Sequence, residues 1–321
     1  MKIQLFILLC VAALLPVGCM DTPSDLATQK AVKVSDFESL TYYDVPVKAG
    51  LATVVVLDQD TLAVTHVPMH LAVPRYAIDQ NALSVTYSQD AIYQNFASSV
   101  YWQYISFEDT RKGDYDYNDL VIHCRVDNRG IFENGVVVAY KHTVSVQPVA
   151  LGGAMHLKLG MLYKENAAMS SLSEAILCQD VRRDIFQGNP IFPINTDPTQ
   201  PIKKVSSKLT PLFEITNTDP QLQVVWFIET SSNRLYAATT NFGADKSYDM
   251  ISPDGLPYGI SMTKKWDYPI EHCSIREAYP GFDAWIASGN EVILLKNFVK
   301  AKVFPAMANG SGNEDLWSWE R

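Results

Sequence analysis

The chain has 321 residues, of which 47% are hydrophobic and 19% charged, and its formal net charge at pH 7 is −9. Because 35 acidic residues outnumber 26 basic ones, the composition argues against nucleic acid as a partner and does not favour an anionic membrane surface. The length suffices for one large domain or two smaller ones.

The first 18 residues are predicted to be a signal peptide. Lys2 supplies a positive start, residues 3–15 are mostly apolar, and the stretch from Leu15 to Cys19 resembles the cleavage site of a bacterial lipoprotein signal. Pro16 departs from that pattern, which usually has leucine there. Cys19 would become the first mature residue and carry the lipid, which predicts an outer membrane lipoprotein, periplasmic or surface-exposed. The alternatives are an ordinary secretory signal and a plain membrane anchor.

The mature chain is expected to be held to the membrane by the lipid on Cys19. Lys2 is the one charged residue of the predicted signal peptide. Cleavage of the signal would therefore leave 25 basic and 35 acidic residues, a net charge of −10. No later apolar run reaches the ~18–20 residues that span a bilayer. We predict a tether over residues 19–35, an N-terminal β region over 36–97 and a β-sandwich-like domain over 98–321.

From residue 36 onward the dominant pattern is that of β-strands. Short apolar or β-branched runs predict strands near 52–57, 82–87, 99–107, 222–228 and 234–240. From Leu120 apolar residues alternate with His123 and Arg125, and Asn134-Gly135 predicts a hairpin turn before a strand at 136–149. The expected fold class is mainly β, with an antiparallel β-sandwich-like core and one or two short helices.

Two segments are predicted to be helical. The first covers residues 169–181. The second begins at Ser274, where Ser-Ile-Arg-Glu has the form of a capping box, is interrupted at Pro280 and Gly281, and resumes until Gly289 supplies the C-cap. Four apolar residues of this second segment form a stripe that is expected to pack on a sheet: Ile275, Tyr279, Phe282 and Ile286.

An acidic loop between two predicted strands carries the main functional signal. Five carboxylates and one side-chain amide fall within twelve positions: Glu108, Asp109, Asp114, Asp116, Asn118 and Asp119. A hard cation that takes six to eight oxygen ligands is their natural partner, which predicts a Ca²⁺ site. An EF-hand is excluded, because Asp119 replaces the turn glycine and Arg125 replaces the last glutamate. Arg111 and Lys112 must then point away.

The alternative for this loop is that its carboxylates cap turns by accepting backbone N–H bonds, while Arg111 and Lys112 balance the charge. Asp114 and Asp119 could also form a glycosidase carboxylate pair. The chain has none of the common hydrolase or nucleotide-binding motifs and lacks a convincing catalytic constellation, so it is not expected to be an enzyme.

The remaining candidate residues are cysteines, histidines and aromatic residues. Three cysteines remain in the mature chain after Cys19, and they allow at most one internal disulfide. They are Cys124, Cys178 and Cys273. Cys124 is expected in the core and the histidines on the surface. Most aromatic residues are expected in the core, whereas Trp317 and Trp319 are predicted to face a ligand such as a glycan.

Several separated motifs, in order, resemble the LruC-domain lipoproteins of Gram-negative bacteria. They are Phe107–Asp109 with Gly113–Val121, then Ala150–Ala154, Asn241–Asp245, Gly255–Ile260, Trp266–Glu271 and Ile275–Pro280. The resemblance covers roughly residues 100–305 and implies a β-rich, lipid-anchored secreted module of unassigned function. Residues 233–236 depart from the expected pattern. The acidic motif also resembles segments of calcium-associated adhesin modules.

These observations predict a cell-envelope lipoprotein that acts as a binding or adhesion module with a calcium-ordered acidic loop. Its partner would be a glycan or a surface protein. One alternative is a structural subunit of a fimbria-like surface assembly, in which an exposed strand edge pairs with a neighbour. The other is a glycan hydrolase.

Overall fold

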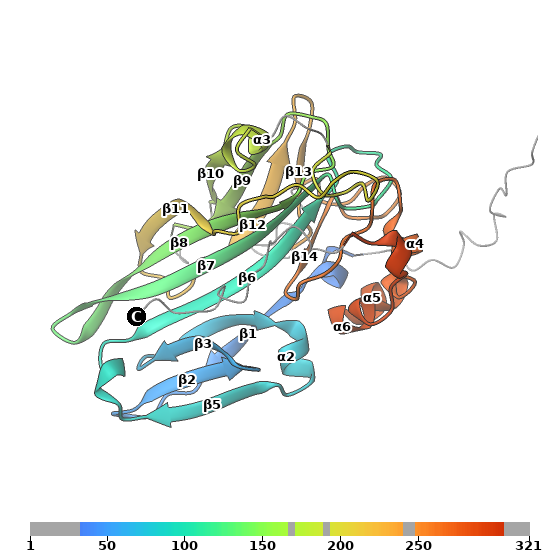
Figure 1. The fold of residues 1–321 in the computed structure, drawn as a ribbon. Coiled ribbons are helices and arrows are strands. Elements are labelled where there is room, and N and C mark those ends of the chain that lie inside the picture. The colour runs from blue at the N-terminus through green and yellow to red at the C-terminus, as the bar shows by residue number, and fades with distance from the viewer. Residues whose placement is uncertain (1–32, 166–170, 189–192, 240–247, 305–321) are drawn as a thin grey trace, which may run out of the picture. The chain divides into compact units, whose positions relative to one another are not determined.

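The computed structural model describes residues 33–165, 171–188, 193–239 and 248–304 (Figure 1). The predicted signal peptide, the lipidation site Cys19 and the aromatic pair Trp317 and Trp319 therefore lie outside the described residues. Residues 32–321 form one compact unit. Within the described part of the chain, no helix has the length and apolar character needed to cross a membrane.

The described elements are mostly short strands. The strands are β1 (Leu40–Val45), β2 (Ala52–Leu57), β3 (Asp60–Thr65), β4 (Met69–Pro74), β5 (Leu83–Ser88), β6 (Ala97–Phe107), β7 (Leu120–Glu133), β8 (Val136–Ala150), β9 (Lys158–Tyr163), β10 (Ser173–Cys178), β11 (Thr210–Asn217), β12 (Val224–Glu229), β13 (Arg234–Tyr236) and β14 (Gly259–Met262). The helices are η1 (Val34–Phe37), α2 (Arg75–Asp79), η2 (Ala91–Tyr93), α3 (Val181–Asp184), α4 (Ile275–Ala278), α5 (Phe282–Ser288), α6 (Glu291–Leu295) and η4 (Lys300–Lys302).

Three antiparallel sheets organise these strands. The largest has the order β11-β8-β7-β6-β3-β2-β5, with β14 also paired to β6; a second has the order β10-β9-β12-β13, and β1 pairs with β4. Strands from both sides of the predicted boundary at residue 97 share the largest sheet, because Ala63–Thr65 of β3 pairs with Ala97–Ser99 of β6. The domain boundaries themselves stay predictions.

The core between the two larger sheets has the layered form expected of a sandwich. Ile105 and Ile122 of the large sheet share one buried apolar cluster with Leu159, Met161 and Trp226 of the four-stranded sheet. Each side chain on these inner faces leaves water on folding, which is the dominant stabilising term. The prediction of a mainly β, antiparallel, sandwich-like fold with short helices is confirmed.

The hairpin of β7 and β8 forms as the sequence predicts. Asn134 and Gly135 have φ values of 50° and 78°, which suits a two-residue turn that matches the strand twist. Cys124 is buried, as expected. The prediction of surface histidines is wrong for two of them, because His123 and His142 are fully buried. His123 lies in a stretch of β7, residues 120–126, that is buried on both faces, and the ring of His142 contacts Asn128 and Asn217.

The helical predictions were partly correct. Residues 173–178 form β10, not a helix, and pair with β9. Ser274 is the N-cap of α4, but its side chain makes no capping bond, so the capping box is wrong. The chain does break at Pro280 and Gly281, and Gly289 ends α5 in the left-handed conformation. The predicted stripe is buried: Ile275, Tyr279, Phe282 and Ile286.

Candidate metal centre

The acidic loop folds around the carboxylate of Glu108, directly after β6. The N–H of Tyr117 donates to Oε1 of Glu108 at 2.7 Å, and that of Tyr115 donates to Oε2 at 3.2 Å. Tyr115 and Tyr117 both have positive φ, 55° and 51°, a conformation that is uncommon for non-glycine residues. Gly113 packs closely against this carboxylate, because a Cβ on it would lie 1.8 Å from Oε2 of Glu108.

Three carboxylates of the loop converge. Oxygen atoms of Glu108, Asp114 and Asp116 all lie within 4.8 Å of one another, and Glu108 and Asp116 are buried whereas Asp114 is exposed. Oδ1 of Asp116 accepts the N–H of Asn118 at 3.2 Å. The arrangement places three negative groups within reach of one cation.

A distant segment completes the cluster, and sequence reasoning did not identify it as part of the site. The N–H of His272 donates to Oδ2 of Asp116 at 2.9 Å, and its ring Nδ1 lies 2.9 Å from Oδ2 of Asp114. The neighbouring Glu271 accepts the hydroxyl of Thr196 at 2.6 Å. The sequence signal was the Trp266–Glu271 motif, which lies more than 140 residues after the acidic loop.

Asn118, two positions after Asp116, brings a buried neutral oxygen beside Glu271. It is fully buried, and its Nδ2 donates to the carbonyl of Pro269 at 3.0 Å. Among the described residues its Oδ1 has no hydrogen-bond partner. A Cβ on Gly152 would lie 2.2 Å from this Oδ1 and 3.0 Å from Oε2 of Glu271, so both oxygens face the space that this glycine leaves open. A buried acceptor without a donor is costly.

Asp109 and Asp119 form a second pair beside the first group. The N–H of Asp109 donates to Oδ2 of Asp119 at 2.8 Å. Gly153 packs against both, because a Cβ on it would lie 2.5 Å from Oδ2 of Asp109 and 3.3 Å from Cβ of Asp119. The structure therefore brings all six predicted residues into one region but divides the carboxylates into two groups. Asp114 and Asp119, the proposed glycosidase pair, fall in different groups.

Burial and mutual repulsion shift the acidity of these groups. Desolvation raises the pKa of Glu108 to about 8, against the opposing effect of the Tyr117 and Tyr115 hydrogen bonds. Desolvation and the charge of Glu108 raise the pKa of Asp116 to about 9. Desolvation and the charge of Asp109 raise the pKa of Asp119 to about 9. Near pH 7 this cluster needs either protons or a cation to be stable.

The basic residues of the loop do not neutralise it. Arg111 forms an ion pair with Asp249 and donates to Oδ1 of Asn233 at 2.9 Å, away from the carboxylate group. Lys112 is exposed. The turn-capping alternative correctly anticipates the backbone N–H contacts to Glu108 and Asp116, but Arg111 does not supply the charge balance that it assumes.

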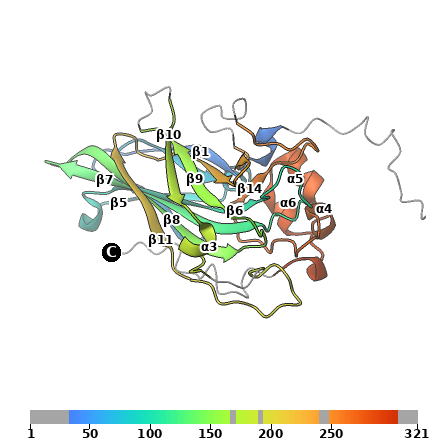
Figure 2. The ribbon, with the colours of Figure 1, turned by 90° about the horizontal axis from the view of Figure 1, so that it is seen from above.

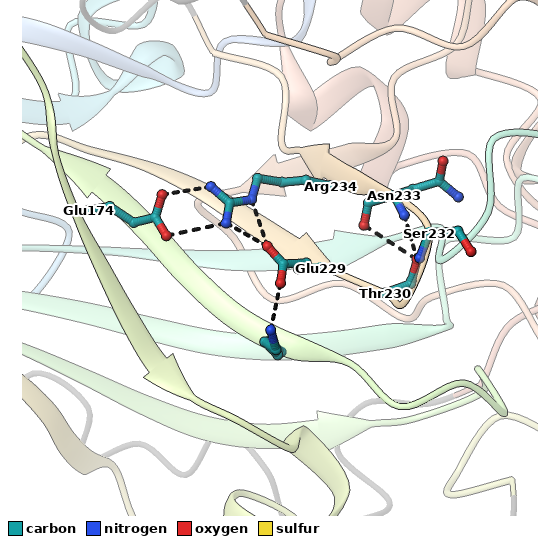
Figure 3. Close-up of polar contacts among 7 residues, drawn as sticks. Glu174, Glu229, Thr230, Ser232, Asn233 and Arg234 are labelled. Carbon is teal, nitrogen blue, oxygen red and sulfur yellow. Dashed lines mark hydrogen bonds and ion pairs between the residues drawn. The ribbon is translucent and has the colours of Figure 1, made fainter.

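A separate charged cluster crosses the outer part of the four-stranded sheet (Figure 3). Arg234 of β13 contacts Glu174 of β10 at 2.6 Å and, through Nε, Glu229 of β12 at 2.9 Å. Lys158 of β9 contacts the other oxygen of Glu229 at 2.6 Å. The guanidinium carbon of Arg234 also lies 4.4 Å from the ring centre of Phe227. Opposite charges balance one another here, which indicates a structural network.

Four aromatic residues in and before the C-terminal helices belong to the core. Trp266, Tyr268, Tyr279 and Trp285 are buried in one cluster, so they offer no platform for sugar stacking. The three cysteines Cys124, Cys178 and Cys273 are buried free thiols.

One family model and one solved structure are similar to this chain. A domain of unknown function, DUF4842, matches residues 194–292, a segment that includes Glu271, His272 and α5. No curated protein matches. A crystal structure of a putative lipoprotein from Bacteroides ovatus aligns with 84% of this chain and 94% of its own, at 11% identity and a TM-score of 0.47. This sequence identity and TM-score are too low for the fold or function of that protein to be transferred to this chain. The LruC-domain assignment stays a prediction, because neither match carries that name.

Proposed function

We propose that the protein is a cell-envelope lipoprotein that acts as a binding or adhesion module, with Ca²⁺ ordering its acidic loop. The observation that carries the proposal is the convergence of oxygen atoms of Glu108, Asp114 and Asp116 within 4.8 Å. The buried Oδ1 of Asn118, two positions after Asp116, has no hydrogen-bond partner among the described residues. Carboxylate and amide oxygens are the ligands that Ca²⁺ prefers. Backbone N–H groups stabilise the carboxylates but bring no net positive charge.

The residues present fit a calcium ion better than a transition metal. The group offers carboxylate oxygen atoms, whereas structural zinc sites are built mainly from Cys and His. His272 approaches through Nδ1, but this ring already pairs with Asp114. Glu108, Asp114 and Asp116 would hold the ion. We propose that Asn118, whose Oδ1 faces the space beside Gly152 together with Glu271, supplies a further oxygen. The bound ion would stabilise a binding surface and is not proposed to take part in a reaction.

Thermal unfolding of the mature chain with Ca²⁺ and with a chelator tests the proposal. We expect a higher melting temperature with millimolar Ca²⁺, because a ligand that binds only the folded state stabilises it by mass action. Asp116→Asn should abolish the shift, since it removes one charge and keeps the shape of the side chain. Glu133→Gln, an exposed carboxylate at the end of β7, is the control and should keep the shift. The same melting temperature with Ca²⁺ and chelator would overturn the calcium proposal.

A further inference from the structure

We infer that the surface formed by α6 and the segment after it contacts the anionic lipid headgroups of the membrane to which the chain is tethered. This surface, the lysine patch, consists of Ile293, Lys296, Phe298, Val299 and Lys300. The inference goes beyond the proposed binding function, and its membrane context rests on the proposed lipidation of Cys19. It concerns a second, direct contact with the bilayer.

The first observation is the exposure of large apolar side chains beside lysines. Ile293, Phe298 and Val299 keep 38%, 42% and 37% of their surface accessible, and all residues from 296 to 301 are exposed. Phe298 packs on the buried ring of Tyr279 with 5.9 Å between ring centres, so it is held in place at the surface. Apolar side chains flanked by lysines are typical of segments that lie in the membrane interface.

The second observation is the local charge. Within the described residues, Lys296 and Lys300 form no ion pair, whereas the nearby carboxylates of Glu277 and Asp283 already pair with Lys302 and Arg276. The patch is therefore locally positive on a chain whose mature net charge is −10. The overall charge argues against an anionic surface as a partner, but contact with a bilayer depends on charges within about 8 Å of it at physiological ionic strength.

The third observation is where the tethered end joins the folded unit. Phe37 of η1 packs against α5, with ring centres 6.5 Å from Phe282 and 5.7 Å from Trp285. The helix α5 begins directly against α6, because a Cβ on Gly281 would lie 3.1 Å from the carbonyl oxygen of Ile293. Figures 1 and 2 show η1 beside the gathered helices α4, α5 and α6.

The chain therefore enters the folded unit beside the lysine patch. Phe37 follows Cys19 by 18 positions, which extend at most about 60 Å, so a lipid on Cys19 holds the point where the chain enters the folded unit within that distance of the bilayer. A nearby anchor raises the effective concentration of the patch at the membrane, and a weak contact then suffices. Each lysine near an anionic surface contributes about 1 kcal/mol.

Vesicle co-sedimentation of residues 20–321 tests the inference without the lipid anchor. This fragment contains the whole compact unit of residues 32–321. We expect binding to vesicles of phosphatidylethanolamine with phosphatidylglycerol, little binding to phosphatidylcholine vesicles, and release at high salt. Lys296→Glu with Lys300→Glu should weaken binding at least about tenfold. Phe298→Ser should weaken it too, with the melting temperature retained.

The control is Lys204→Glu with Lys208→Glu, which makes the same charge change at two exposed lysines outside the patch. This variant should bind nearly as well as the parent. No binding of the parent at saturating lipid, equal binding to both vesicle types, or equal loss in both double variants would overturn the inference. Lipidation of Cys19 is measured separately from the mass of the mature protein, so failure of the anchor and failure of the patch are distinguishable.

Discussion

The backbone N–H of His272 donates to the carboxylate of Asp116 at 2.9 Å, although 156 positions separate them in the chain. The ring of the same histidine meets Asp114. One residue thus connects two carboxylates of the acidic loop to the segment that precedes α4. Anything that orders the loop should also order this segment, because Asp116 accepts the N–H of Asn118 from the loop and the N–H of His272 from this segment.

Hydrogen exchange can detect this coupling. We expect Ca²⁺ to slow exchange of the amides of Asn118 and His272 together, since both donate to Asp116 and local opening of either segment breaks a bond to that carboxylate. The amides of Tyr115 and Tyr117, which donate to Glu108 of the same carboxylate group, should slow as well. The amides at the Asn134-Gly135 turn should not change. His272→Ala keeps the backbone donor and should preserve most of the protection. Slowing confined to the acidic loop would show that the two segments are independent.

The close approach at Gly152 gives a second prediction. Gly152→Ala places a methyl group 2.2 Å from Oδ1 of Asn118, so Asn118 or its neighbours must move. We expect a loss of about 1–3 kcal/mol in the free energy of unfolding and a smaller calcium-dependent rise in melting temperature. Ala154→Ser, at an exposed position of the same connection, serves as the control. A Gly152→Ala variant with parental stability and parental calcium response would contradict the described contact.

The elements predicted from sequence are those with strong local signals. The Asn134-Gly135 turn, the apolar alternation from Leu120 and the break at Pro280 each depend on a few neighbouring residues. Residues 173–178 lack such a signal. Their Ser-Glu-Ala-Ile-Leu-Cys sequence is compatible with a helix, and pairing with β9 decides that it is a strand. Local propensity is a weak prior when a sheet edge is available.

The candidate site was predictable only in part for the same reason. Carboxylate density identified the acidic loop, because ligands from one short segment are visible in the sequence. Glu271 and His272 come from a segment with ordinary local composition, and only the fold places them against Asp116. The two buried histidines, His123 and His142, show that a polar residue in an alternating strand faces solvent only when nothing packs on that side.

The charged network of β10, β12 and β13 predicts unequal coupling energies. Arg234 contacts both Glu174 and Glu229, but the Glu174 side chain is 40% exposed and that of Glu229 is 23% exposed. Solvent screens the more exposed pair. In double-mutant cycles with Arg234→Met, we expect a coupling energy of about 0.5 kcal/mol between Arg234 and Glu174, measured with Glu174→Gln. We expect a coupling energy of about 1–2 kcal/mol between Arg234 and Glu229, measured with Glu229→Gln. Equal coupling energies, or a larger one for Glu174, would contradict this ranking.

The buried carboxyl group of Glu291 predicts a pH dependence of stability outside the acidic loop. Desolvation raises its pKa from 4.5 to about 7, although the hydroxyl and N–H of Thr263 and the charge of Lys264 act in the opposite direction. The N–H of Thr263 donates to Oε2 at 2.9 Å, and its hydroxyl donates to Oε1. The folded state therefore holds this proton more tightly than the unfolded state.

The sign follows from proton linkage. Between pH 4.5 and 7 the folded chain binds more protons at Glu291 than the unfolded chain, so this group's contribution to the free energy of unfolding falls as pH rises. It is largest below pH 4.5 and is lost by about pH 7. The glutamine in Glu291→Gln resembles the protonated acid at every pH. We expect the variant to gain stability relative to the parent as pH rises, by on the order of 3 kcal/mol.

Denaturant unfolding of the parent and Glu291→Gln between pH 4.5 and 8 measures this difference. The carboxylates of the acidic loop titrate in both proteins and largely cancel in the comparison. Glu133→Gln, which changes an exposed group, should show a nearly constant offset from the parent. A pH-independent difference for Glu291→Gln would mean that the carboxyl of Glu291 ionises in the folded state as it does in the unfolded chain, which its burial against Thr263 argues against.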